Sequence, residues 1–126
     1  MSTLQPFTAV DTRALDLDPS PVPDDQRLAG TPATGAVRLG TVGGANIGVW
    51  EMTAGGMRDV EVDEVFLVID GEATVTWTRP DGTETTIELR PGVLCRLEAG
   101  MTTRWDVTRN LRKFYLAGPY AEAARG

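Results

Sequence analysis

The stretch DVEVDEVFLVIDGEATVTW, residues 59–77, decides the fold class of this chain. Apolar and polar residues alternate along much of it, with the period of a β-strand. This alternation places Glu64 on one face together with four apolar residues, Val60, Val62, Phe66 and Val68. Because burying a carboxylate without a partner costs several kcal/mol, we expect Glu64 to have a partner or a chemical role.

Short strand patterns recur along the chain from residue 36 onward, and turn signals separate them. Gly43-Gly44, Pro91-Gly92 and the hairpin signal Arg79-Pro80-Asp81-Gly82 mark the clearest turns. The expected strands cover residues 36–42, 46–53, 57–62, 64–69, 72–78, 83–90, 93–100, 102–107 and 112–118. Many short strands with almost no helical pattern predict an all-β protein, an antiparallel sandwich or barrel.

The strand patterns divide the chain into three parts. Residues 1–35 are expected to form an extended N-terminal arm, since the part from residue 11 contains four prolines and no sustained period. Residues 36–118 form the β-domain, and residues 119–126 form a short C-terminal tail. Scattered apolar residues in the arm suit docking on a second copy, so we expect a homodimer with the arm lying on its partner.

Composition excludes several classes of function. The 126 residues suffice for one domain with a core, and their net charge of −6 argues against nucleic acid and anionic membranes as partners. No apolar run approaches the roughly 20 residues that cross a bilayer. The N-terminus lacks the pattern of an export signal, and a single cysteine excludes an internal disulfide. A cytoplasmic protein is expected.

The sequence contains no histidine, the residue most often used as a metal ligand and general base. Cys95 is the only cysteine, so a cysteine-based zinc site is excluded as well. It alternates with Val93 and Leu97, which indicates a small buried residue and not a nucleophile. We therefore expect neither a bound metal nor a cofactor.

Several motifs resemble the cupin superfamily. Glu64, six residues and Gly71 are similar to the second half of the first cupin motif, and Gly92, five residues and Glu98-Ala99-Gly100 are similar to the second. The segments GVWEMTAGG (48–56), DEVFLVIDG (63–71) and RWDVTRNLRKFYL (104–116) look like the small, single-domain ureidoglycine aminohydrolase-type subfamily. The resemblance implies an antiparallel double-sheet jelly-roll barrel.

The same resemblance implies a metal site of three histidines and a glutamate at the barrel mouth. Of these ligands only Glu64 is present. The two histidines of the first motif would fall at Arg58 and Val60, or at Met57 and Asp59 if the spacer is one residue longer. The histidine of the second motif would fall at Thr103.

Three roles are open for Glu64: a remnant metal ligand, a general acid/base, or a structural carboxylate paired with an arginine. Arg58, Arg96 and Arg104 lie on strands that would line or rim the mouth of a cupin, and Arg58 is the expected partner. The expected ligand-binding residues are the inward or mouth positions of the resemblance together with two arginines: Arg58, Val60, Phe66, Arg96, Thr103 and Trp105.

These observations lead to two functional hypotheses. The first is a metal-free cupin that binds a small polar organic molecule in the barrel mouth without strong catalysis of its own. The second is a metal-independent isomerase, cyclase, lyase or hydrolase of a small metabolite. In this enzyme Glu64 would act as general acid/base, its pKa raised by the apolar neighbours Val62, Phe66 and Val68. A mouth closed by side chains favours a structural Glu64, and an open mouth favours chemistry.

Overall fold

The computed structural model describes residues 4–118, and the tail expected at 119–126 lies outside them. Within residues 4–118 the regular structure is all β, as the alternation predicted, and no helix there is long and apolar enough to cross a membrane. The strands are β1 Ser20–Pro21, β2 Arg27–Ala29, β3 Ala33–Val42, β4 Ala45–Met52, β5 Gly55–Val60, β6 Glu64–Thr78, β7 Glu84–Leu89, β8 Leu94–Leu97 and β9 Thr102–Ala117.

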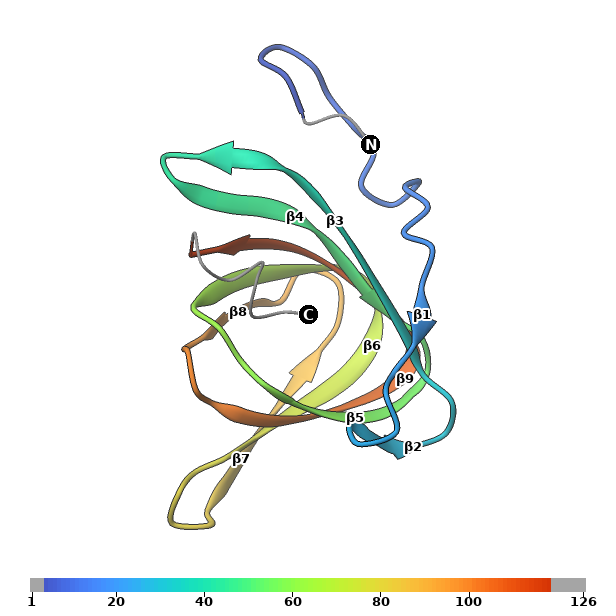
Figure 1. Ribbon diagram of the computed structural model, residues 1–126, viewed down its shortest axis with the longest axis vertical. Helices are drawn as coiled ribbons and strands as arrows, with labels where there is room; N and C mark the ends of the chain where they lie inside the picture. Colours follow the sequence, from blue (N-terminus) through green and yellow to red (C-terminus); the bar gives the residue numbers. More distant parts are fainter. Residues whose placement is uncertain (1–3, 119–126) are drawn as a thin grey trace.

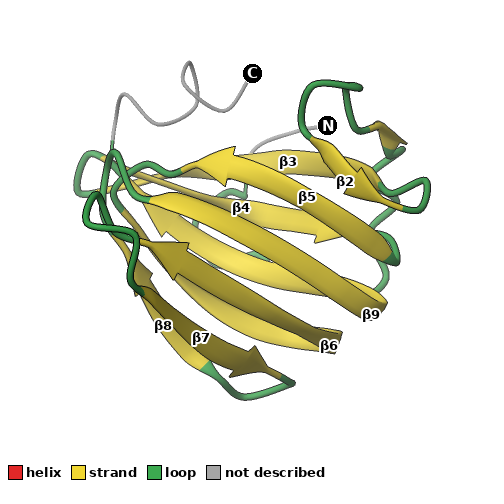
Figure 2. Cartoon of the chain, turned by 90° about the horizontal axis from the view of Figure 1, so that it is seen from below, coloured by secondary structure: helices red, strands yellow, loops and turns green. Residues whose placement is uncertain are grey.

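The strands pair antiparallel and curl around a central space, which is the cupin jelly-roll arrangement (Figures 1 and 2). β9 occupies the middle of this sheet. It pairs with β4 and β5 on one side and with β6 along nearly its whole length on the other. β6 in turn pairs with β7 and β8. The inward faces of β4, β5, β6 and β9 therefore meet in one core.

β6 is one long strand, although the sequence suggests two strands separated by Asp70-Gly71. The pairing with β9 shifts register on both sides of Asp70, which indicates β-bulges at this point. Gly71 has a φ of 91°, and a Cβ there would lie 2.7 Å from Leu111 Cα and closer still to Asn110 O. The glycine thus lets the strand bend against β9 without ending it.

The arm packs on its own barrel, and the expectation that it lies on a partner stays a prediction. β1 pairs with β3, and β2 pairs with β5. Val22 is buried in the main core, and Leu17 is buried against Leu39 and Val49 on the outer side of β3 and β4. Val22 and Leu17 therefore find their partners within the same chain, whereas Leu28 of β2 is exposed.

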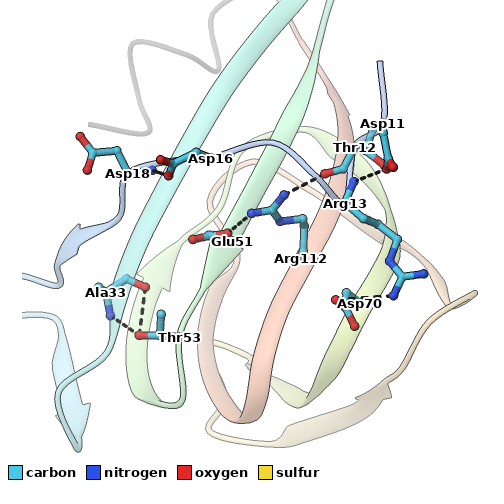
Figure 3. A network of polar contacts seen from close by, with 10 residues as sticks. All are labelled: Asp11, Thr12, Arg13, Asp16, Asp18, Ala33, Glu51, Thr53, Asp70 and Arg112. Carbon is cyan, nitrogen blue, oxygen red and sulfur yellow. Dashed lines mark hydrogen bonds and ion pairs between the residues drawn. The ribbon is translucent and has the colours of Figure 1, made fainter. Parts of the chain in front are cut away.

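Arg112 of β9 fixes the start of the arm to the outside of the barrel (Figure 3). Its guanidinium donates to the backbone oxygen of Thr12 at 2.9 Å and to the carboxylate of Glu51 on β4. Arg13 lies 3.9 Å from the Asp70 carboxylate nearby. Charged residues on the outer face thus hold the arm, while the inner face remains available for the site described next.

Candidate functional site in the barrel centre

Glu64 begins β6 and points into the barrel, next to the inward residues Phe66 and Val68. Its partner is Lys113 of β9, whose Nζ lies 2.7 Å from Glu64 Oε2. The Glu64 side chain has 0% and the Lys113 side chain 1% of its surface exposed, so the two charges face each other out of contact with solvent. The expected burial of Glu64 is confirmed, and its ion-pair partner is a lysine.

Three aromatic rings surround the Lys113 ammonium group. Nζ lies 4.2 Å from the centre of the Phe66 ring, 4.7 Å from that of Trp50 and 4.8 Å from that of Trp105. The Trp105 ring contacts the other two, with centroid distances of 5.5 Å to Trp50 and 5.8 Å to Phe66. Ring faces attract cations, so this aromatic cage compensates part of the hydration that Lys113 loses on burial.

Glu61 contributes a second buried carboxylate to the barrel centre. Its Oε2 accepts hydrogen bonds from the Thr103 hydroxyl at 2.6 Å and from the Trp105 indole N–H at 2.9 Å. Both neighbours donate to the same oxygen, which is the arrangement that suits an ionised carboxylate. Thr103 and Trp105, both predicted as ligand-binding residues, therefore lie in the centre and orient Glu61.

Burial and charge shift two pKa values in this region. Burial lowers the pKa of Lys113 to about 8, while the negative charges of Glu61 and Asp59 act in the opposite direction. Burial also raises the pKa of the Cys95 thiol, against the influence of Lys113. Cys95 is thus a buried, protonated core residue, as its alternation with Val93 and Leu97 predicted.

Arg58 and Val60 do not belong to the centre, and the prediction that they line it is wrong. Val60 is 64% exposed, and the Arg58 guanidinium donates to the backbone oxygen of Asp25 in the arm, at 2.9 Å from Nε and 2.7 Å from Nη2. β5 ends at Val60, so its alternation does not continue in phase into β6. The inward residues of β5 are Met57 and Asp59, which agrees with the longer spacer of the first motif.

The other two arginines also lie outside. Arg96 is on the outer face of β8, where its Nη2 is 3.5 Å from the Asp63 carboxylate and its Nη1 donates to the backbone oxygen of Glu64. Arg104 is exposed and contacts Asp106 and Glu84. The expectation of an arginine opposite the Glu64 carboxylate is therefore wrong, because β8 and β9 alternate so that these positions face outward.

Lys113 and Glu61 were not among the residues predicted for the site. Lys113 is the only lysine of the sequence and lies in phase with Leu111, Tyr115 and Ala117, all of which are buried. This phase was visible in the segment LRKFYLA, residues 111–117. Glu61 follows the last residue of β5, and only the change of phase there turns it inward.

A cleft of about 360 Å³ opens between the arm and the barrel. We call it the arm cleft. Trp50, Met57 and Asp59 form its barrel side, and the rest of its lining comes from the arm and β3: Ser20, Pro21, Val22, Pro23, Gln26, Thr34, Gly35 and Ala36. Another cleft, of about 300 Å³, lies far from the centre on β6, β7 and β9 and includes Glu72, Glu88 and Asp106. The arm cleft shares Trp50 with the aromatic cage, and a shallower cleft of about 220 Å³ includes Glu64 and Arg96 in its lining.

The barrel centre does not fit the metal that the resemblance implies. The positions of the histidines hold Met57, Asp59 and Thr103, and a lysine ammonium lies against the remaining ligand, Glu64. Among residues 4–118, no three His, Cys, Asp or Glu side chains are grouped so that they could hold a metal ion. A thioether, a hydroxyl, the Asp59 carboxylate and the ion-paired Glu64 carboxylate, without a nitrogen or thiolate ligand, make a poor donor set for a transition metal.

Comparison with known proteins agrees with this fold. Residues 39–115 match the EutQ-like cupin domain family. The EutQ protein of Clostridium difficile superimposes with a TM-score of 0.63 at 19% identity, over 88% of this chain and 86% of that one. A protein of unknown function from Pseudomonas syringae pv. tomato, of the DUF861 family, gives a TM-score of 0.64 at 26% identity, over 86% of this chain and 46% of that one.

A further solved structure is the putative ethanolamine utilization protein Q of Salmonella typhimurium, with a TM-score of 0.54 at 14% identity, over 82% of this chain and 98% of that one. No curated protein matches the chain. The family match covers most of the barrel, from β3 to β9, and includes both Glu64 and Lys113. The chain belongs to the EutQ-like cupin domain family.

Proposed function

We propose that this protein is a metal-free cupin that binds a small polar organic molecule at the mouth of its barrel, without strong catalysis of its own. The observation that carries the proposal is the arm cleft, which has room for a small metabolite and whose barrel side is formed by Trp50, Met57 and Asp59. Concave sites with an apolar wall and a few polar groups are the usual places for small ligands.

The lining of the arm cleft favours a ligand that donates hydrogen bonds. Asp59 is its charged group, Gln26 and Thr34 add polar side chains, and this described lining contains no lysine or arginine. Trp50 offers an indole ring against which a planar group can pack. Amines, amides and ureides fit this chemistry better than carboxylates do, and the resemblance to the ureidoglycine aminohydrolase-type subfamily supports the same class.

The burial of the centre supports binding over catalysis. Glu64 and Lys113 are paired with each other and have almost no exposed surface. Trp50 lies both in the cleft lining and against the Lys113 ammonium, so the cleft and the aromatic cage meet at this ring. A closed centre favours a structural role for Glu64. The aminohydrolase reaction of the resembling subfamily depends on a metal, and the centre provides no donor set for one.

One observation favours the alternative, a metal-independent enzyme with Glu64 as general acid/base. Burial lowers the pKa of Lys113 to about 8, and its amine lies 2.7 Å from the Glu64 carboxylate, at hydrogen-bond distance for a proton transfer. In this alternative a substrate must reach two side chains that have almost no exposed surface. Conversion of a bound compound by the wild type, lost in Glu64→Gln while binding persists, would favour the enzyme.

A thermal-shift screen followed by calorimetry tests the proposal. The panel holds small amines, amides and ureides next to carboxylates of the same size. We expect compounds of the first group to raise the melting temperature, and Asp59→Asn to weaken their binding at least about tenfold, since a charged hydrogen bond is lost. Asp106→Asn, in the remote cleft, is the matched control. Binding by carboxylates alone, or equal binding by Asp59→Asn, would contradict the proposed site.

A further inference from the structure

The barrel centre has the composition of a site that recognises an ammonium ion. Such sites combine aromatic faces with nearby carboxylates, and all of these groups are present around Lys113 Nζ. Three rings lie within 4.8 Å of this atom, and the Glu64 carboxylate lies 2.7 Å away. The negative charges of Glu61 and Asp59 also act on it.

Lys113 is placed in this cage by the strand register. On β9 it lies opposite Trp50 of β4 on one side and opposite Val68 of β6 on the other. Its side chain therefore projects inward from the middle of the sheet and reaches Glu64, the one residue present of the metal ligands that the cupin resemblance implies. The buried positive charge of this space is thus supplied by the chain itself.

We propose that the centre of this barrel is an ammonium-binding site that the chain fills with its own Lys113, in place of a metal ion. A lysine ammonium is a compact point charge with three N–H donors. One of them reaches Glu64, and the cation lies close to the faces of Phe66, Trp50 and Trp105. This inference concerns the closed centre and does not depend on a ligand in the arm cleft.

The wild-type protein allows a direct test. Lys113 is the only lysine, so isotope labelling of lysine with nitrogen-15 yields one side-chain amine signal in the NMR spectrum. We expect its protons to exchange slowly with water and to shift upfield, because the group is buried against ring faces. Manganese, zinc or magnesium chloride should leave the melting temperature unchanged. A rapidly exchanging signal at the position of a free lysine, or stabilisation by submillimolar metal, would overturn the inference.

The Lys113→Ala variant provides the second test, by replacement of the missing group. The variant should melt well below the wild type, and n-butylammonium chloride should recover several degrees of that loss without affecting the wild type. n-Butanol has a similar size without the charge, and sodium chloride controls for ionic strength. Equal recovery by n-butanol, or none by n-butylammonium, would show that Lys113 only fills space and that the site does not require a positive charge. If the variant does not fold, the NMR measurement on the wild type decides alone.

Discussion

Lys113 and Glu64 form an ion pair across β9 and β6, 2.7 Å apart, with neither side chain reaching solvent. A buried pair of this kind adds little net stability over well-packed apolar residues, since both ions lose their hydration. Removing one partner destabilises the protein, because the other charge then stays buried without a counter-ion. The pair therefore adds little stability as a whole, but a substitution of either residue alone is costly.

Glu64→Gln should lower the free energy of unfolding by roughly 1–3 kcal/mol, because Lys113 then faces a neutral amide. Lys113→Met should also destabilise, and the double variant should lose less than the sum. Chemical denaturation at pH 7 measures all three, with Glu72→Gln on the exposed side of β6 as control. A Glu64→Gln variant as stable as the wild type would instead indicate a carboxyl kept neutral, as the catalytic alternative requires.

Arg58 should not couple with Glu64. Its guanidinium donates to the Asp25 backbone oxygen on the outside of the barrel, so Arg58→Ala should weaken only the attachment of the arm. The effects of Arg58→Ala and Glu64→Gln should then add to within about 0.5 kcal/mol in a double-mutant cycle. A larger coupling energy would restore the arginine as a partner of the carboxylate.

Stability should rise with pH in an interval set by Lys113. Burial lowers the pKa of Lys113 in the folded protein to about 8, whereas the ordinary value is 10.5. Between these values the unfolded chain binds more protons than the folded one, so the free energy of unfolding increases with pH there and gains nothing below about 8. The free energy of unfolding of the wild type minus that of Lys113→Met, measured by chemical denaturation at pH 7.5, 9 and 10, should increase over this interval. A flat or falling difference would be contrary to expectation.

Gly71→Ala should be strongly destabilising. The left-handed φ of 91° disfavours any side chain, and a Cβ would overlap the backbone at Asn110 and Leu111. Gly82 has a φ of 89° but nothing within 4 Å of a Cβ, so Gly82→Ala carries the conformational cost alone. The melting temperature of Gly71→Ala should therefore lie well below that of Gly82→Ala. Equal values would mean that β6 and β9 separate easily at the bulge.

The homodimer expected from the sequence stays a prediction, and the outer face of β6, β8 and β9 is a candidate surface for it. Leu67 pairs with Leu94 in register, and Leu116 lies opposite the neighbouring Val65, so exposed leucines form one patch. Leu94→Glu should convert a dimer to a monomer in light scattering at micromolar concentration. Leu28→Glu, on the exposed β2 at the other edge of the sheet, should not. A monomeric wild type would contradict the prediction.

Alternation alone was enough to predict the all-β fold and the inward direction of Glu64, because both depend on the period of two along β6. It did not predict the inward direction of Glu61 or the outward direction of Val60. The alternation changes phase where β5 ends, and the sequence carries no turn signal at that point. The partner of Glu64 was missed for another reason. Charged residues are usually read as surface residues, and only the buried phase of Leu111 and Tyr115 placed Lys113 inside.

The central place of β9 has a consequence for the order of events during synthesis. β4, β5 and β6 are all made before the strand that joins them, and their pairing edges stay open until β9 has left the ribosome. Lys113 arrives with that strand, so Glu61 and Glu64 can remain hydrated until then. Barrel closure and charge neutralisation thus become a single late step, in which the nascent chain gains its cation at the moment it excludes water.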